Sequence, residues 1–380
     1  MKRIPIRADA DRSLSAFMAF LADCRAEARA DGEPRLVSVS LEADHLDPLA
    51  VLESIYEPDD LHFYLEHPSS RIALAGAEAV LRRDFSGAGR FRDAQHFIRS
   101  TFSRTIAAGD LEGPMAGPRF FCSFGFFGGG DSDSPFTPAT VFVPRWQVVR
   151  FGDRFCAVAN CMVEPDSKLD AVAERIWRAH GKFQSFSYAP GQEVDPGDRV
   201  PSKPVMVQGG LKQVEVGPPG RFEASVATVL KEIGADICRK VVLARAVDVT
   251  TGSDLHPLAS LNRLRVAYPD CFSFSVANGR GQSFIGATPE RLVQVTGRSL
   301  QTEALAGSTR RGASAVEDAI LARSLLQSEK DIREQNLVLE SILRRLSNLG
   351  IREPETSRLG LLQLSNVQHL HTSVRAELPD

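Results

Sequence analysis

The stretch Ile237-Cys-Arg-Lys-Val-Val-Leu-Ala-Arg245 marks the point where a predicted helix gives way to a predicted strand. An apolar run extends from Val241 to Val247 and is interrupted only by Arg245, and Lys240 stands immediately before it. The side chain of Lys240 is our first candidate for a functional group, because partial burial favours the neutral, basic form of a lysine. The alternative is a surface lysine that ends a helix and interacts with its dipole, which is the commoner situation for lysine.

Length, composition and charge exclude several classes of protein. The 380 residues suit one large domain or two ordinary ones, and 43% apolar with 24% charged residues is typical of a globular chain. A formal charge of −3, spread over intermixed acids and bases, predicts no nucleic-acid surface and no anionic-membrane surface. The sequence has neither a membrane-length apolar run nor a secretory signal, so we expect a cytoplasmic protein. Its six cysteines lack CxxC spacing and indicate buried thiols in a reducing compartment.

Periodicity predicts an alternation of helices and strands along the whole chain. Upstream of residue 189 we expect helices at Ser13–Ala30, Arg90–Ala107 and Leu169–His180, with strands at Leu36–Glu42, Leu61–Glu66, Arg71–Ala75, Thr140–Phe142, Trp146–Arg150 and Phe155–Cys161. A segment rich in proline, glycine and charge, 189–220, predicts a linker with a boundary near residue 215. Downstream we expect helices at Arg221–Ile237, Pro257–Tyr268 and Ala315–Leu349, with strands at Val241–Val249, Cys271–Ala277, Ser283–Gly286, Arg291–Val295, Leu300–Leu305 and Gln363–Leu378.

The glycine-rich run from Phe124 to Asp131 resembles a phosphate loop only superficially. The Gly-Lys-Ser/Thr of such a loop does not follow it, and no helical pattern opens there. Glycines interleaved with phenylalanines are typical of close backbone packing, and we expect this run beside an aromatic core.

Glu334 lies on an apolar stripe of the predicted long helix, on one face with Val338 and Ile342. A carboxylate in that position is costly unless it is paired or bound to a cation. Two interpretations are open: an ion pair with Lys330, one turn away, or a metal ligand.

Three further residues and a glutamate are candidates for binding or catalysis. Gly307 and Ser308 lie where a strand turns toward the long helix, and backbone N–H groups at such a turn can hold a carboxylate, although a plain turn glycine fits equally well. His369 shares one side of a strand with His371, and such a pair without a third ligand is weak evidence for a metal. Glu290 follows a proline between two predicted strands, so its carboxylate is expected at a sheet edge.

Five motifs occur in one order along the second half of the chain. They are Lys240-Val-Val-Leu-Ala-Arg245, Gly286-Ala-Thr-Pro-Glu290, Leu305-Ala-Gly-Ser-Thr-Arg-Arg311, Ser328-Glu-Lys-Asp331 with Glu334, and Gln368-His369-Leu370. Together they resemble the chorismate-utilising enzymes, and most closely the isochorismate synthases. The resemblance implies an α+β fold with large, mainly antiparallel sheets and outer helices. It also implies a variable amino-terminal region, 1–214, and a chorismate-binding catalytic region, 215–380.

The resemblance also implies roles for particular side chains. Lys240 would be the general base that activates water, and Glu290 the general acid that protonates the hydroxyl leaving chorismate. Glu334 would be a ligand of Mg²⁺. Gly307, Ser308 and His369 would bind the substrate.

Two positions distinguish among members of this superfamily. Relatives that use ammonia typically carry glutamine in place of Lys240, and some carry a nucleophilic lysine where this chain has Ala306. Both positions predict water as the nucleophile, hence isochorismate as product and no glutamine amidotransferase subunit. Salicylate synthases share the lysine and go on to eliminate pyruvate, so they are the alternative. The sequence does not distinguish a role in menaquinone, siderophore or salicylate biosynthesis.

Members of this family usually continue for about another hundred residues after the Gln-His-Leu motif. We therefore expect that the chain is truncated at its carboxyl end, and that a second Mg²⁺ ligand and further carboxylate-binding groups lie beyond it. The 380-residue chain alone is expected to be inactive and to associate, and the complete protein to be a monomer. An inactive fragment or pseudoenzyme of the family is the remaining alternative.

Overall fold

A computed structural model describes residues 1–4, 14–43, 45–113, 115–129, 134–174, 176–177, 211–252 and 255–379. The chain divides into two compact units, which we describe separately. Unit 1 comprises Met1–Val200 and Pro257–Pro289, and unit 2 comprises Pro201–His256 and Glu290–Asp380. The division of the sequence into an amino-terminal region, 1–214, and a catalytic region, 215–380, stays a prediction. Most of the predicted linker 189–220 lies outside the described residues.

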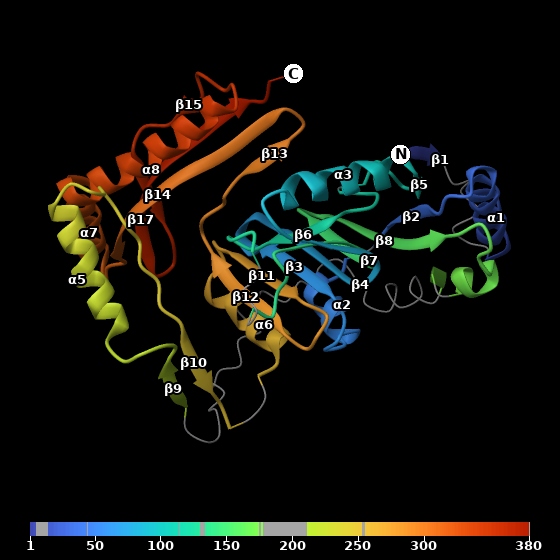
Figure 1. The fold of residues 1–380 in the computed structure, drawn as a ribbon, viewed down its shortest axis with the longest axis horizontal. Coiled ribbons are helices and arrows are strands. Elements are labelled where there is room, and N and C mark those ends of the chain that lie inside the picture. Colours follow the sequence, from blue (N-terminus) through green and yellow to red (C-terminus); the bar gives the residue numbers. More distant parts are fainter. Residues whose placement is uncertain are drawn as a thin grey trace. The chain divides into compact units, whose positions relative to one another are not determined.

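Unit 1 is built on a sheet that contains ten strands within the described residues (Figure 1). They are β1 (Lys2–Ile4), β2 (Arg35–Glu42), β3 (His62–His67), β4 (Ile72–Phe85), β5 (Thr105–Gly109), β6 (Phe121–Phe124), β7 (Ala139–Phe151), β8 (Arg154–Val163), β11 (Phe272–Ala277) and β12 (Ser283–Thr288). The order is β1-β5-β2-β8-β7-β4-β3-β11-β12, with β6 paired to β7. Strand β5 pairs in parallel with β1 and β2, and the other neighbours are antiparallel.

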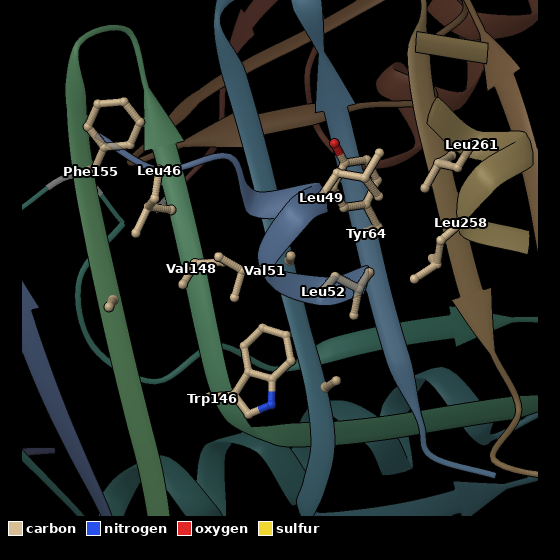
Figure 2. Close-up of a cluster of buried hydrophobic side chains, with 13 residues drawn as sticks. Leu46, Leu49, Val51, Leu52, Tyr64, Trp146, Val148, Phe155, Leu258 and Leu261 are labelled. Carbon is tan, nitrogen blue, oxygen red and sulfur yellow. The ribbon is translucent and has the colours of Figure 1, made fainter. Parts of the chain in front are cut away.

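Helices cover this sheet and give unit 1 its buried core. They are α1 (Leu14–Asp31), α2 (Pro48–Ser54), α3 (Arg90–Ser103) and α6 (Pro257–Ala267), with a 3-10 turn η1 (Pro68–Ser70). Successive residues of β7 point to opposite faces, so Val148 packs with α2 and α6 while Val149 belongs to a second cluster on the other face. Figure 2 shows the first cluster, to which α2 contributes Leu49 and Leu52, α6 contributes Leu258, and the sheet contributes Tyr64 and Trp146.

A buried charge cluster holds the segment 257–289 in unit 1. The Arg265 guanidinium donates to both carboxylate oxygens of Asp47, at 2.9 and 2.8 Å, and approaches Glu66 at 3.4 Å. Burial raises the pKa of Glu66, although Arg265 and the Tyr64 hydroxyl oppose the rise. This bidentate contact and the pairing of β11 with β3 attach the segment 257–289 to unit 1, although it follows residues of unit 2 in the chain.

Unit 2 contains a smaller antiparallel sheet and a separate two-stranded ribbon. Its elements are β9 (Lys212–Glu215), α5 (Arg221–Gly234), β10 (Val247–Thr250), β13 (Gln294–Thr296), β14 (Ser299–Arg310), α7 (Ala315–Gln327), α8 (Glu329–Asn348), β15 (Glu355–Thr356), β16 (Gly360–Gln363) and β17 (Val367–Glu377). The sheet order is β13-β14-β17-β15, with β16 paired to β17, and β9 pairs with β10. Helix α8 packs on β14 and β17 through a cluster that includes Leu300, Leu346 and Val374.

These antiparallel sheets with helices against them confirm the predicted α+β class. The described helices are each too short or too polar to cross a bilayer.

The predicted strand Val241–Val249 is wrong over most of its length. Only Val247–Thr250 forms a strand, and residues 241–246 are irregular. Strand β10 pairs with the four residues of β9, and one further bond, from the Val216 amide to the Ala246 carbonyl at 2.9 Å, ends the pairing. An apolar run forms a strand only where a neighbouring strand pairs with it along its length. Strand β9 has four residues and is too short to pair with residues 241–246 as well as with β10.

Two predicted helices also differ from the structure. The long helix Ala315–Leu349 is broken at Ser328, whose extended backbone and hydroxyl cap α8 by accepting the Asp331 amide. The predicted helix Arg90–Ala107 ends at Ser103, because Thr105–Gly109 joins the sheet as β5. Gly350 follows α8 with a φ of +86°, as expected of the residue after a helix.

The glycine-rich run shows the predicted close backbone packing, since a Cβ at Gly128 would lie 2.8 Å from the Gly87 carbonyl oxygen, but it does not lie beside a buried aromatic core. Phe126 and Phe127 are 91% and 76% exposed, and the described part of the run forms a loop held by the Arg90 side chain, which donates to the carbonyls of Gly125 and Phe126. The bonds go to the backbone and leave Phe126 and Phe127 in solvent, whereas Phe124 stacks on Phe91 with ring centroids 4.6 Å apart.

Candidate active site

The Lys240 ammonium contacts the Glu334 carboxylate at 2.8 Å. Both side chains are about one-third exposed, at 29% and 35%. Lys240 lies on the irregular segment after α5, and Glu334 lies in the second turn of α8. The ion pair of Glu334 with Lys330 was one of the two interpretations left open by the sequence, and the observed partner of Glu334 is instead Lys240, 94 residues away in the chain. Glu334 keeps a cationic partner, as its place on an apolar stripe requires.

A hollow of about 480 Å³ surrounds this ion pair within unit 2. Apolar side chains of α5, Val241–Leu243 and Leu337 form most of its wall. The charged groups are Arg239, Lys240, Lys330, Arg333 and Glu334. With four cations and one carboxylate, the hollow has the charge and the mixed polarity that a small anionic substrate requires.

Gly307 lies at an irregularity in β14, where the register against β17 shifts between Ala306 and Ser308. Its φ is +76°, and a Cβ there would approach the Cβ of Asp331 on α8 to 2.9 Å. Only glycine therefore allows the first turn of α8 to lie this close to the strand. Because Asp331 and Glu334 are three residues apart on α8, the glycine fixes the helix near the Lys240–Glu334 pair.

The shifted register makes Ser308 the direct partner of His369 on β17. The Ser308 hydroxyl and His369 Nδ1 are 2.7 Å apart. Burial lowers the pKa of His369, while the Gly307 backbone and the negative charge of Glu290 act in the opposite direction. Glu290, in the turn before β13, is thus close enough to influence this histidine electrostatically.

The same face of the sheet carries a group of charges that sequence analysis missed. Glu303 accepts a hydrogen bond from His371 Nε2 at 2.9 Å and lies 4.0 Å from Arg291 Nε. On paired antiparallel strands, such diagonal neighbours are within reach of long side chains. The sequence contained one indication of this group, because His369 and His371 lie two residues apart and therefore share one face of β17. Their partners could not be predicted, because they depend on the register of β14 against β17.

The described residues provide one carboxylate for a metal ion at the ion pair, Glu334. No cluster of three potential ligands occurs within the described ranges. Mg²⁺ keeps several waters and is often held by one or two carboxylates together with substrate oxygens. A single glutamate in a hollow suited to an anion fits that partial role, and an all-protein cage is not formed by these residues.

The structure places all six predicted site residues in unit 2 and forms two contacts among them. Lys240 meets Glu334, and Ser308 meets His369. Gly307 connects α8 to β14 between these contacts, and Glu290 lies within electrostatic range of His369.

The chain matches the family model described as chorismate binding enzyme over residues 20–380. It is 31% identical to the salicylate biosynthesis isochorismate synthase of Pseudomonas aeruginosa, in a match that covers 93% of this chain and 71% of the relative. It is 24% identical to an isochorismate synthase of Bacillus subtilis, over 90% of this chain and 71% of that one.

Among solved structures, the menaquinone-specific isochorismate synthase of Escherichia coli has a similar fold. The TM-score is 0.66 at 21% identity, and the match covers 98% of this chain and 76% of the other.

The chain therefore belongs to the chorismate-binding enzymes. Within that family it is an enzyme of the isochorismate synthase type, and the resemblance seen in its motifs is confirmed. The alternative of a salicylate synthase gains no comparable support.

Proposed function

We propose that the protein converts chorismate to isochorismate, with Lys240 and Glu290 as the general base and general acid. The observation that carries the proposal is the contact of Lys240 with Glu334, since it joins a basic group to a candidate metal ligand inside a cationic hollow. Lys240 occupies the position at which the ammonia-using relatives typically carry glutamine.

The reaction adds water to one ring carbon and removes the hydroxyl from another. The Lys240 amine takes a proton from water as the water oxygen bonds to the ring. The ring double bonds shift, and the original hydroxyl leaves with a proton from Glu290. Because an ammonium group cannot accept a proton, the proposed base is the neutral amine form of Lys240.

Gly307, Ser308 and His369 are proposed to hold the substrate. The Gly307 backbone lies at the irregularity in β14 next to Ser308, and the Ser308–His369 pair presents a hydroxyl and an imidazole on the open face of the sheet. These groups can donate hydrogen bonds to carboxylate oxygens.

Glu334 would hold a Mg²⁺ ion, which when bound supplies positive charge for a carboxylate of the substrate. We also infer that water alone is the nucleophile, that no amidotransferase subunit is required, and that the complete protein is monomeric. A cytoplasmic location is supported by the six cysteines, which are all free thiols.

The test is an assay of the protein, expressed from its complete reading frame, with chorismate and Mg²⁺. Isochorismate, salicylate and remaining chorismate are separated by chromatography. We expect isochorismate to accumulate until it is in equilibrium with chorismate. Salicylate formed without a partner enzyme would favour the alternative activity, and unchanged chorismate would contradict the proposal.

A further inference from the structure

Glu303 occupies a central place on the open face of the β14–β17 sheet. Its side chain is only 14% exposed, and its carboxylate faces His371 Nε2 at 2.9 Å. Because a carboxylate only accepts hydrogen bonds, His371 Nε2 must be the donor. Thus one side of the carboxylate is bonded to β17.

The other contacts of Glu303 are with the residue that follows Glu290. The backbone N–H of Arg291 donates to the Glu303 carboxylate, and Arg291 Nε lies 4.0 Å from it. The hydrogen bond from His371 and the positive charge of Arg291 lower the pKa of Glu303, and burial opposes them, so the group is ionised at neutral pH. A second bond, from the Thr302 hydroxyl to the Leu292 carbonyl at 2.8 Å, fixes the same turn to β14.

These contacts matter because the turn itself contains little regular structure. Glu290 is exposed and lies between β12 and β13, which begins only at Gln294. A catalytic acid must be held close to one position, so contacts that fix the residues next to Glu290 bear directly on its placement. The described bonds to its neighbours, Arg291 and Leu292, both come from adjacent residues of β14.

We propose that Glu303 is a positioning residue for Glu290. Its carboxylate joins the backbone of Arg291 to His371, and so holds the turn that carries Glu290 within electrostatic range of His369. Glu303 acts through Glu290 and does not itself touch the substrate. This proposal rests on the proposed function of Glu290 as the acid.

The test is a double-mutant cycle between Glu303→Gln and Glu290→Gln. Glutamine keeps the size of Glu303 but removes the charge. We expect Glu303→Gln to lower kcat about 10- to 100-fold, as a displacement of about 1 Å does in well-oriented sites, with a smaller change in KM. In the Glu290→Gln background, the same change should have little further effect, because its action through Glu290 has already been lost.

A matched control is Glu377→Gln, an exposed position near the end of β17, which should leave kcat unchanged. Circular dichroism and thermal unfolding establish that each variant is folded. If Glu303→Gln does not fold, His371→Phe removes the donor on the other side of the carboxylate, and the cycle is repeated with it.

The possible outcomes separate the two proposals. Equal multiplicative losses in both backgrounds, or normal kcat in a folded Glu303→Gln protein, would overturn the positioning role. Normal activity of Glu290→Gln would instead refute the assignment of the acid. Wild-type protein that forms no isochorismate would refute the proposed function itself.

Discussion

The two units differ in where their side chains are buried. Unit 1 contains three of the four buried apolar clusters found in the described residues, and its sheet positions bury Tyr64, Trp146 and Val148 almost completely. Unit 2 contains one such cluster, and none of the described residues of α5 is buried. Yet all six predicted site residues belong to unit 2. The comparison suggests that unit 1 contributes packing and that the chemistry depends on a less densely buried sheet face with long-range polar contacts.

The largest expected effect is on the chemistry in unit 2. Lys240→Ala should lower the rate of isochorismate formation by about 10²- to 10⁴-fold, the usual range for loss of a general base. The thermal unfolding temperature should change little, because Lys240 is partly exposed and its pair with Glu334 is screened by solvent. Chromatographic assay and calorimetry measure the two quantities.

Lys231→Ala, on the exposed surface of α5, is the control for this substitution. Near-wild-type turnover by a folded Lys240→Ala protein would show that Lys240 is a structural residue.

Leucine truncations compare the two units directly. Leu258→Ala in α6 removes a fully buried side chain and should lower the free energy of unfolding by about 2 to 5 kcal/mol. Leu230→Ala in α5, where the side chain is 62% exposed, should change it by less than about 0.5 kcal/mol. Urea denaturation measures both. Equal losses would mean that α5 is covered in solution and would remove the contrast in burial.

Acid should destabilise unit 1 through His62. This histidine is buried against Ser275, with Nε2 at 2.8 Å from its hydroxyl, and burial lowers its pKa from 6.5 to about 4. Between these two values the unfolded chain binds a proton that the folded chain does not, so stability falls as the pH decreases from about 6.5. From pH 7 to pH 5 the loss attributable to His62 is about 2 kcal/mol.

His62→Gln, which retains a hydrogen-bonding side chain without this titration, should show a correspondingly smaller loss in the same interval. Unfolding free energies at pH 7 and pH 5 provide the measurement. An identical pH dependence in the two proteins would exclude His62 as its source.

The smallest expected effect concerns Mg²⁺ in unit 2. The Lys240 ammonium contacts the Glu334 carboxylate and competes there with a metal ion. Lys240→Met should therefore strengthen Mg²⁺ binding in the absence of chorismate by about tenfold, the scale on which neighbouring groups alter metal affinity. Isothermal titration calorimetry with Mg²⁺ alone tests this. Lys231→Met serves as the control, and unchanged or weaker binding by the Lys240 variant would argue against Glu334 as the ligand.

Much of the fold could be predicted from local pattern. The predicted helices Ser13–Ala30 and Pro257–Tyr268 correspond closely to α1 and α6, and the predicted strands Trp146–Arg150 and Phe155–Cys161 lie within β7 and β8. These elements were predictable because their apolar periodicity or turn residues lie within a short window of sequence. Two predictions were wrong. The strand from Val241 depends on the length of its partner strand β9, and the helix predicted to continue through Ser328 is interrupted because that residue caps α8.

By itself, the sequence determined the order of five motifs, the family to which they belong, and the candidate groups Lys240, Glu290 and Glu334. Only the tertiary structure decided which groups meet. Local spacing offered Lys330 as the partner of Glu334, whereas folding brought Lys240 to 2.8 Å. The irregularity at Gly307 likewise placed Ser308 opposite His369, and the register of β14 placed Glu303 beside Arg291 and His371. Such contacts join residues far apart in the chain, and their distances depend on strand register and helix approach, which short-range periodicity does not encode.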